Sequence, residues 1–327
     1  MPRRLPPVPD PLLAVAGRQA GLVSVGQCLE HGVTRDQAAA HVRRGDWQVA
    51  ARTVYDVGPA YGTHPVDHAR RRAAVLGVLA HPGAVATGLC ALVLHGVLGA
   101  PQVVEPEVTL PTGAARRPRP PVRLRRIVVR ARTAPGGFPA ATVPDALVQA
   151  VPALDRRHAV ALMDSALHQR LLTPSELTAA HASAARHPGI ARTHGWWPSA
   201  DGDAESPAET WARLSCVDSG CPPDVLQLPV ADGEGRPFAR IDLAWLLPDG
   251  RALLVEIDGR DVHSTPEAVF ADRRRQNRIV TPQTVVRRFS GRDAWRGEVG
   301  PAVRRELLAA GWYRRPVRPG IVLRLDR

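Results

Sequence analysis

Two carboxylates, Asp242 and Glu256, have the spacing and the surroundings of a metal-binding pair. Each lies in a largely apolar run, 238–245 and 251–259, and turn residues at 248–250 predict that the two runs form a hairpin of adjacent strands. Burying an acid is costly unless it is paired or bound to a cation. Two carboxylates with water oxygens suit Mg²⁺ or Mn²⁺, which could polarise a phosphate and activate water. A pair of acids held by nearby arginines fits the same pattern equally well.

Residues that follow this pair carry groups used in acid–base chemistry and in phosphate binding. In chain order these candidates are Asp258, His263, Asp272, Arg275 and Gln276. Asp258 shares a strand face with Glu256, and His263 is a candidate general acid or base because imidazole titrates near neutral pH. The other three follow an i, i+3, i+4 pattern on one helix face. They could orient the site or bind phosphate, or Asp272 could simply pair with Arg275.

The elements that must position these groups form the predicted C-terminal domain, 200–327. Apolar runs bounded by turn residues predict strands, and capping residues followed by helical spacing predict helices. The expected strands are 225–230, 238–245, 251–259 and 284–289, and the expected helices start at 206 or cover 265–280 and 292–310. The sequence therefore predicts a mixed sheet flanked by helices.

The first 60 residues predict a winged helix-turn-helix. Ser24 and Thr34 are each followed three residues later by glutamine, which is the capping-box pattern at a helix start. Gly32 and Gly45 stand where these two helices should end. Two short strands, 47–49 and 52–57, are expected to follow, and this order of elements is typical of that DNA-binding fold.

The second of these helices is predicted to present a DNA-contacting face. Gln37, His41 and Arg44 lie on the side opposite the small apolar residues, and Gln and Arg make paired hydrogen bonds to adenine and guanine in the major groove. Arg52, in the predicted wing, could hold a phosphate. The same side chains also fit a merely solvated face, and a winged helix can serve as a protein-contact module.

A middle α+β part is predicted over 64–198. Strands are expected at 103–110 and 122–130, and helices at 145–172 and 174–181. The segment 109–143 contains no acid. It holds eight arginines, namely Arg116, Arg117, Arg119, Arg123, Arg125, Arg126, Arg130 and Arg132. Such a segment can attract a phosphate backbone by releasing counterions, and it fits a solubilising loop beside an exposed strand face equally well.

The composition of the chain excludes some catalytic mechanisms and argues against a membrane-spanning segment. The 327 residues carry a net charge of +12, and all 43 cationic side chains are arginine, which excludes mechanisms with a catalytic lysine. The four cysteines are scattered, as expected of free thiols in a reducing cytoplasm. The segment 73–104 has no charged residue, but His81, Pro82 and Gly83 interrupt it. Two short buried helices are therefore expected there instead of a membrane span.

The C-terminal motifs together resemble a nuclease family. They are Arg240-Ile-Asp-Leu-Ala-Trp, Val255-Glu-Ile-Asp-Gly, His263, Asp272-Arg-Arg-Arg-Gln-Asn and Val286-Arg-Arg-Phe. This set resembles the very-short-patch-repair-like branch of the PD-(D/E)XK nuclease superfamily and is similar to uncharacterised actinobacterial proteins of that branch. The N-terminal part resembles the winged-helix domain of AbiEi-type antitoxins, which are transcriptional repressors of phage-defence toxin–antitoxin pairs.

The nuclease resemblance implies roles for four residues of this chain. Asp242 and Glu256 would be metal ligands, Glu209 on the preceding helix would be an accessory acid, and His263 would match the histidine of the repair-type branch. The resemblance thereby implies Mg²⁺ or Mn²⁺ as cofactor.

One departure from the motif of the nuclease superfamily bears on whether the site can hydrolyse DNA. The superfamily motif expects a lysine where this chain has Asp258, and the chain contains no lysine that could take its place. Gln276 or Arg275 are the candidates to orient water or neutralise charge instead.

The combined prediction is an α/β protein, α+β overall, with three parts. These are a winged helix-turn-helix (1–60), an α+β middle unit (64–198) and a restriction-endonuclease-like domain (200–327). The predicted function is DNA binding with Mg²⁺-dependent phosphodiester hydrolysis. The alternative is a catalytically inactive DNA-binding regulator or antitoxin with double-stranded DNA and a cognate toxin as partners, and a weaker one is a protein-interaction scaffold. A cytoplasmic location is expected.

Overall fold

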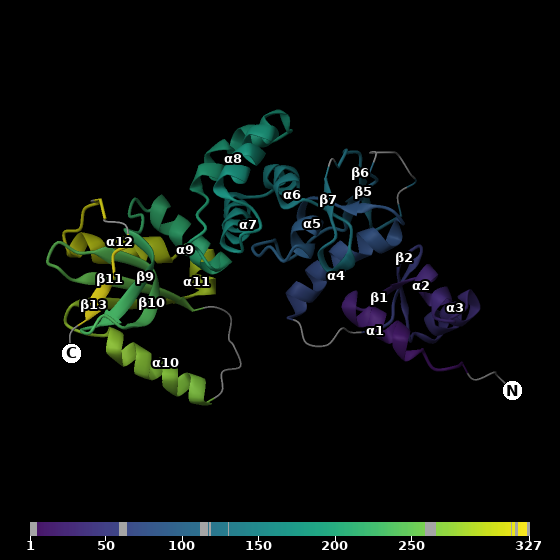
Figure 1. Cartoon of the computed structure of the whole chain (residues 1–327), viewed down its shortest axis with the longest axis horizontal. Coiled ribbons are helices and arrows are strands. Elements are labelled where there is room, and N and C mark those ends of the chain that lie inside the picture. Colours follow the sequence, from purple (N-terminus) through teal and green to yellow (C-terminus); the bar gives the residue numbers. More distant parts are fainter. Residues whose placement is uncertain are drawn as a thin grey trace. The chain divides into compact units, whose positions relative to one another are not determined.

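The computed structural model describes most of the chain as a mixture of helices and strands (Figure 1). It describes residues 5–58, 64–111, 117, 119–129, 131–258, 266–314, 316–317 and 320–325, without the side chains of 186, 266–269 and 271–272. The chain divides into two compact units. Unit 1 is Met1–Asp155 with Leu171–Pro198, and unit 2 is Arg156–Arg170 with Ser199–Arg327.

The N-terminal part of unit 1 follows the predicted order of elements. These are α1 (Asp10–Arg18), β1 (Leu22–Ser24), α2 (Val25–Glu30), α3 (Arg35–Arg44), β2 (Gln48–Ala51) and β3 (Val54–Asp56). Both predicted capping boxes are confirmed, since Ser24 and Thr34 each exchange two hydrogen bonds with the glutamine three residues later. Gly45 ends α3 with φ +81°, which explains glycine there. The three strands form one sheet in the order β1-β3-β2.

The rest of unit 1 surrounds a five-stranded sheet in the order β6-β5-β4-β8-β7. Its strands are β4 (Val85–Ala86), β5 (Glu107–Thr109), β6 (Arg123–Arg125), β7 (Arg132–Thr133) and β8 (Ala140–Ala141). Its helices are α4 (Pro65–Ala80), α5 (Gly88–Leu94), α6 (Val143–Ala150), α8 (Pro174–Ser183) and the 3₁₀ segments η1 (Pro135–Gly137), η2 (Val151–Ala153), η3 (Ala184–Arg186) and η4 (Ile190–Ser199). The uncharged segment 73–104 contributes the end of α4 and all of α5. Within the described ranges, no helix has the length and apolar character needed to cross a membrane.

Several predicted elements of the middle part differ from those in the structure. The helix expected at 145–172 is three elements, because Pro152 lacks the N–H that would continue α6 and the chain changes direction through η2. The last of them, α7 (Arg156–His168), belongs to unit 2. The strands expected at 103–110 and 122–130 shorten to three residues each.

Unit 2 is built on a mixed five-stranded sheet in the order β12-β11-β10-β9-β13. The strands are β9 (Val225–Asp232), β10 (Pro237–Leu246), β11 (Ala252–Asp258), β12 (Thr284–Ser290) and β13 (Leu323–Leu325). β10 runs antiparallel to β9 and β11, whereas β12 is parallel to β11 and β13 is parallel to β9. The alternation of apolar side chains in β10 and β11 supplies a core on each face of this sheet.

Helices cover both faces of the unit 2 sheet. On one face Leu243, Trp245 and Val255 pack against α9 (Pro207–Asp218), α11 (Gly291–Arg296) and α12 (Val299–Ala309). On the other face Ala244 and Leu254 pack against α10 (Pro266–Ile279). The single helix predicted at 292–310 is divided into α11 and α12 by a left-handed glycine between them. The protein is thus α+β overall.

A buried ion pair fixes α7 against α9 within unit 2. The Asp164 carboxylate is 1% exposed and accepts hydrogen bonds from Thr210 Oγ1 at 2.8 Å and from Arg213 Nη2 at 2.7 Å. Burial raises the pKa of Asp164 to about 6, although Arg213 opposes this effect. The two helices are therefore held together by a charged contact as well as by apolar packing.

Candidate functional site

Asp242 and Glu256 come together in the structure as the hairpin predicts. The antiparallel pairing of β10 and β11 ends at Leu243 and Val255, which directly adjoin Asp242 and Glu256, and Asp242 Oδ2 accepts a hydrogen bond from the Ile257 N–H of β11. Glu256 alternates with Leu254 and contacts Arg275 of α10, so its side chain lies on the sheet face that α10 covers. In the parallel register with β12, Glu256 is beside Arg288. Three adjacent strands therefore bring two acids and one guanidinium close together.

Glu256 is held by two arginines. Its Oε1 accepts a hydrogen bond from Arg275 Nη1 at 2.7 Å, and its Oε2 accepts one from Arg288 Nε at 2.8 Å. The Glu256 residue is 6% exposed, whereas the two arginine side chains are about a third exposed. Charge-assisted bonds of this length offset the cost of burying the carboxylate. This is the arginine-held arrangement that the sequence left open.

Asp242 has a different environment. Its Oδ2 accepts a hydrogen bond from the Ile257 backbone N–H at 2.7 Å, and no ion pair joins Asp242 to any residue of the described ranges. Burial raises the pKa of Asp242 to about 7; the bond to Ile257 opposes this effect, and the negative charges of Glu209, Glu256 and Glu205 add to it. The protonated form of Asp242 is therefore favoured to a higher pH than in an exposed aspartate.

Glu209 lies in the first turn of α9, where Ser206 caps the helix by accepting from the Glu209 N–H. Its Oε2 accepts from Gln227 Nε2 at 2.8 Å and from the Glu205 backbone N–H at 2.9 Å. Burial raises the pKa of Glu209. Glu205 itself pairs with Arg240, at 2.5 Å between Oε1 and Nη2. Glu209 is thus an acceptor in a local network and also part of the negative field around Asp242.

The donor set that would hold Mg²⁺ or Mn²⁺ does not fit such an ion in this arrangement. Both oxygens of Glu256 are occupied by guanidinium groups. Across the described part of the chain, no three His, Cys, Asp or Glu side chains are grouped so as to hold a metal ion. With Glu256 held by Arg275 and Arg288, Asp242 alone of the predicted ligand pair is left to bind an ion, whereas Mg²⁺ requires several oxygen ligands in near-octahedral geometry.

The remaining predicted residues of the C-terminal site are only partly described. Asp258 is 56% exposed in its side chain, with Oδ1 3.8 Å from Arg288 Nη2. Gln276 is half-buried on α10. His263 and the side chain of Asp272 lie outside the described residues. The structure therefore brings together Asp242, Glu256 and the α10 arginine that the sequence analysis named.

In unit 1, His41 is not on the outward face of α3. It is 8% exposed, its Nδ1 lies 3.2 Å from Asp46 Oδ2, and its ring stacks on Trp47 with 4.7 Å between centroids. Trp47 is 3% exposed and belongs to the core, so the stacking turns His41 inward beside Ala38. This corrects the assignment of His41 to the DNA-facing side, because a buried imidazole cannot reach a base edge.

The other predicted contacts of unit 1 are accessible to different degrees. Gln37 is half-buried, and its side-chain oxygen accepts from the Thr34 N–H at 2.8 Å as part of the capping box. Arg44 and Arg52 are exposed, the first on α3 and the second in the turn between β2 and β3. Arg43 is exposed as well and was missed by the sequence analysis. The signal that could have identified Arg43 as exposed is Trp47, because its position in the core fixes the rotation of α3.

The arginine-rich segment of unit 1 is partly structural. Arg119 Nη1 donates to the Ala80 carbonyl at 2.6 Å, and Arg125 Nη1 bonds Glu107 Oε2 at 3.1 Å. Other members of the segment are exposed, namely Arg117, Arg123, Arg126 and Arg132. Arg116 and Arg130 lie outside the described residues. The segment therefore supplies both internal contacts and free positive surface.

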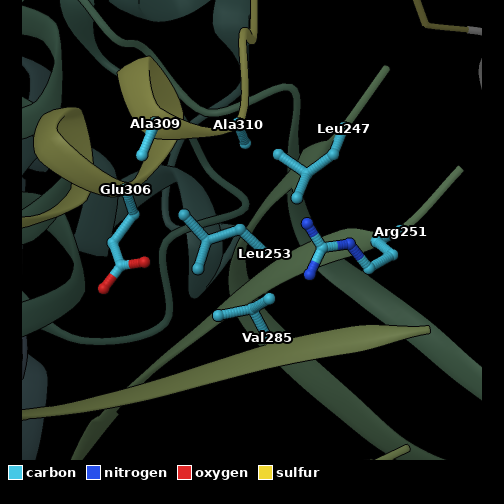
Figure 2. Close-up of a pocket in the computed structure, with 7 residues that line it drawn as sticks. All are labelled: Leu247, Arg251, Leu253, Val285, Glu306, Ala309 and Ala310. Carbon is cyan, nitrogen blue, oxygen red and sulfur yellow. The ribbon is translucent and has the colours of Figure 1, made fainter. Parts of the chain in front are cut away.

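A cavity of about 140 Å³ opens elsewhere in unit 2, between the β10–β11 hairpin and α12. Figure 2 shows Arg251 and Glu306 on either side of an apolar floor that includes Leu253. Glu306 is already bonded to Arg287, and Arg251 is bonded to Asp249. None of the residues singled out from the sequence lines this cavity.

Comparison with known proteins gives relatives but no family. No family model matches the chain. Two uncharacterised proteins of Mycobacterium tuberculosis, from strains CDC 1551 and H37Rv, are each 34% identical to it over 182 residues. The match covers 53% of this chain and 63% of each relative, so the chain spans less than two thirds of their length. Their descriptions assign no activity.

Proposed function

We propose that the protein is a DNA-binding regulator, in which the N-terminal part of unit 1 acts as a winged helix-turn-helix that contacts duplex DNA. The observation that carries this proposal is the exposed positive charge of α3 and of the following turn, from Arg43, Arg44 and Arg52. A helix that projects such groups suits a major groove, and the turn between two strands suits the adjacent phosphates.

The charge of the whole chain supports the same proposal. Its net charge is +12, and every cation is arginine, whose planar guanidinium binds phosphate in a paired geometry. The exposed members of the arginine-rich segment in unit 1 add to this surface. Such charge increases affinity for any duplex without selecting a sequence, whereas α3 would supply the selection.

We propose further that unit 2 has a restriction-endonuclease-like fold but does not hydrolyse DNA. Its mixed sheet, flanked by helices on both faces, agrees with that fold. Two observations favour an inactive site. Arg275 and Arg288 occupy both oxygens of Glu256, and among the described residues no three His, Cys, Asp or Glu side chains are grouped to hold a metal ion. A cognate toxin and a cytoplasmic location remain predictions.

A Mg²⁺-dependent nuclease is the second candidate, and one observation favours it. Asp242, Glu209 and Glu205 interact electrostatically, and Asp242 has a raised pKa for which no cation of the described residues compensates. Such a concentration of negative charge is typical of sites that recruit a cation. For this candidate to hold, Glu256 must first leave its two arginine partners.

DNA binding can be tested through its salt dependence. Fluorescence anisotropy would measure the affinity of the full chain for a labelled duplex of mixed sequence at several salt concentrations. Each phosphate contact contributes a slope of about −0.9 in log K against log salt, so replacing Arg43 and Arg44 by Gln should lower the slope by about one to two. Arg251→Gln, an exposed arginine of unit 2, is the matched control. An unchanged slope in the double variant would refute the proposal for α3.

Hydrolysis can be tested separately on supercoiled plasmid with Mg²⁺ or Mn²⁺. We expect no nicking by the wild-type protein under conditions in which it binds DNA. Metal-dependent cleavage that disappears in both Asp242→Asn and Glu256→Gln, but persists in Arg251→Gln, would establish the second candidate instead. DNA binding by unit 1 would stand in either case.

A further inference from the structure

Two histidines from separate elements of unit 1 meet at their ring nitrogens. His181 is in the last turn of α8, and His194 is in η4. His181 Nε2 lies 2.8 Å from His194 Nδ1, and the ring centroids are 5.1 Å apart with 52° between the ring planes. At least one of the facing nitrogens carries a lone pair, because two N–H groups could not approach so closely.

The surroundings hold one ring in place and leave the other open to solvent. The ring of His181 stacks on Trp197 with 5.1 Å between centroids and 7° between planes, and Trp197 is 3% exposed. His194 is exposed. The lone pair on the facing nitrogen is the group that a metal ion would bind, since metal ligation uses neutral imidazole.

We propose that His181 and His194 form a two-histidine site for a divalent transition-metal ion such as Zn²⁺ or Ni²⁺. Imidazole nitrogen is a preferred ligand of these ions and a poor one for Mg²⁺. With metal–nitrogen distances near 2.0–2.1 Å and tetrahedral angles, the two nitrogens would stand about 3.3 Å apart. The pair must therefore separate by about 0.5 Å and the rings must pivot so that both lone pairs converge on the ion, which replaces the proton between them.

Water completes the coordination of this site. No third His, Cys, Asp or Glu side chain joins the pair among the residues that the structure covers, and exposed His194 leaves room for solvent ligands. A bound ion would add to the stacking of His181 on Trp197 in tying the end of α8 to η4, and the chain joins these elements through the six residues 184–189. Binding should therefore stabilise this part of unit 1. The inference is independent of the proposed DNA binding.

The test uses untagged full-length protein in a buffer that does not bind metals. Calorimetry measures Zn²⁺ binding, and Ni²⁺ titration follows the quenching of tryptophan fluorescence, because a paramagnetic ion on His181 would lie close to Trp197. Even groups that only support a metal ligand contribute about tenfold or more to affinity, so His181→Ala and His194→Ala should each weaken binding by at least about tenfold. Zn²⁺ should raise the melting temperature of the wild type but not of these variants.

His168→Ala, which removes an exposed histidine of unit 2, is the control and should bind like the wild type. Circular dichroism checks that each variant is folded. If His181→Ala and His194→Ala bind Zn²⁺ as tightly as the wild type, or if the wild type shows no saturable binding, the site does not exist and the two nitrogens only share a proton.

Discussion

Replacing Asp242 by Asn should stabilise the protein at alkaline pH and leave its stability at acidic pH nearly unchanged. The pKa of Asp242 is raised from 3.8 to about 7 in the folded protein. Between these two pH values the folded state binds a proton that the unfolded state has released, so the wild type loses stability as pH rises from about 4 to about 7. Above pH 7 the loss is complete. Asparagine cannot ionise, so the variant does not undergo this loss of stability.

The magnitude follows from the two pKa values. A difference of about three corresponds to a free energy of about 4 kcal/mol. Asp242 is only half-buried, so solvent screening makes this an upper limit. The Asn side-chain oxygen can still accept the hydrogen bond from the Ile257 N–H, so the substitution does not leave this backbone donor unpaired. We therefore expect the variant to gain at least about 1 kcal/mol at pH 8 relative to pH 4.

The assay is urea unfolding of wild type and variant at several pH values from 4 to 9, followed by circular dichroism and tryptophan fluorescence. The quantity to compare is the difference in unfolding free energy as a function of pH. Asp258→Asn is the comparison variant, since it removes an exposed carboxylate from the neighbouring strand β11. A flat difference for Asp242→Asn would show that a cation compensates this carboxylate and would refute the reasoning. Repeating the series with Mg²⁺ would reveal such a cation directly.

Three further substitutions test the packing of unit 2. Glu256→Gln removes the negative charge that both arginines contact and leaves one accepting oxygen instead of two. It should lower the unfolding free energy by about 1.5–3 kcal/mol, seen as a lower urea midpoint; an unchanged midpoint would mean that the arginine contacts are not structural. Asp164→Asn leaves the buried guanidinium of Arg213 without its counter-charge and should lower the unfolding free energy by about 3–5 kcal/mol in the same measurement. A decrease of less than about 1 kcal/mol would contradict this prediction. Gly300→Ala places a methyl group 2.1 Å from the Ser215 carbonyl oxygen and should destabilise by at least about 1–3 kcal/mol, whereas Gly17→Ala, with open space around it, should be neutral or stabilising in thermal melts.

The helix starts of this protein were predictable from the sequence because a capping box depends only on residues three positions apart. Ser24 and Thr34 form the boxes that their spacing predicts. The hairpin of β10 and β11 was equally local, since turn residues and apolar runs were enough to place Asp242 and Glu256 on neighbouring strands. These features need no information from distant parts of the chain.

The rotation of α3 could not be read from its own residues. Small and polar side chains cover most of that helix, so its apolar face is poorly defined by periodicity. Trp47, beyond the helix end, decides which side turns inward by stacking on His41. The exposed arginines follow from that contact, which explains why the sequence pointed to His41 instead of Arg43.

The sequence by itself determined that two acids would meet on neighbouring strands, but it left open whether cations of the protein or a metal ion would accompany them. Tertiary structure decided this, because the parallel pairing of β11 with β12 brings Arg288 beside Glu256 from 32 residues away. Arg275 reaches the same carboxylate from α10. Local patterns fix which residues share a strand or a turn, whereas the partners of a buried charge depend on long-range packing that no local pattern records.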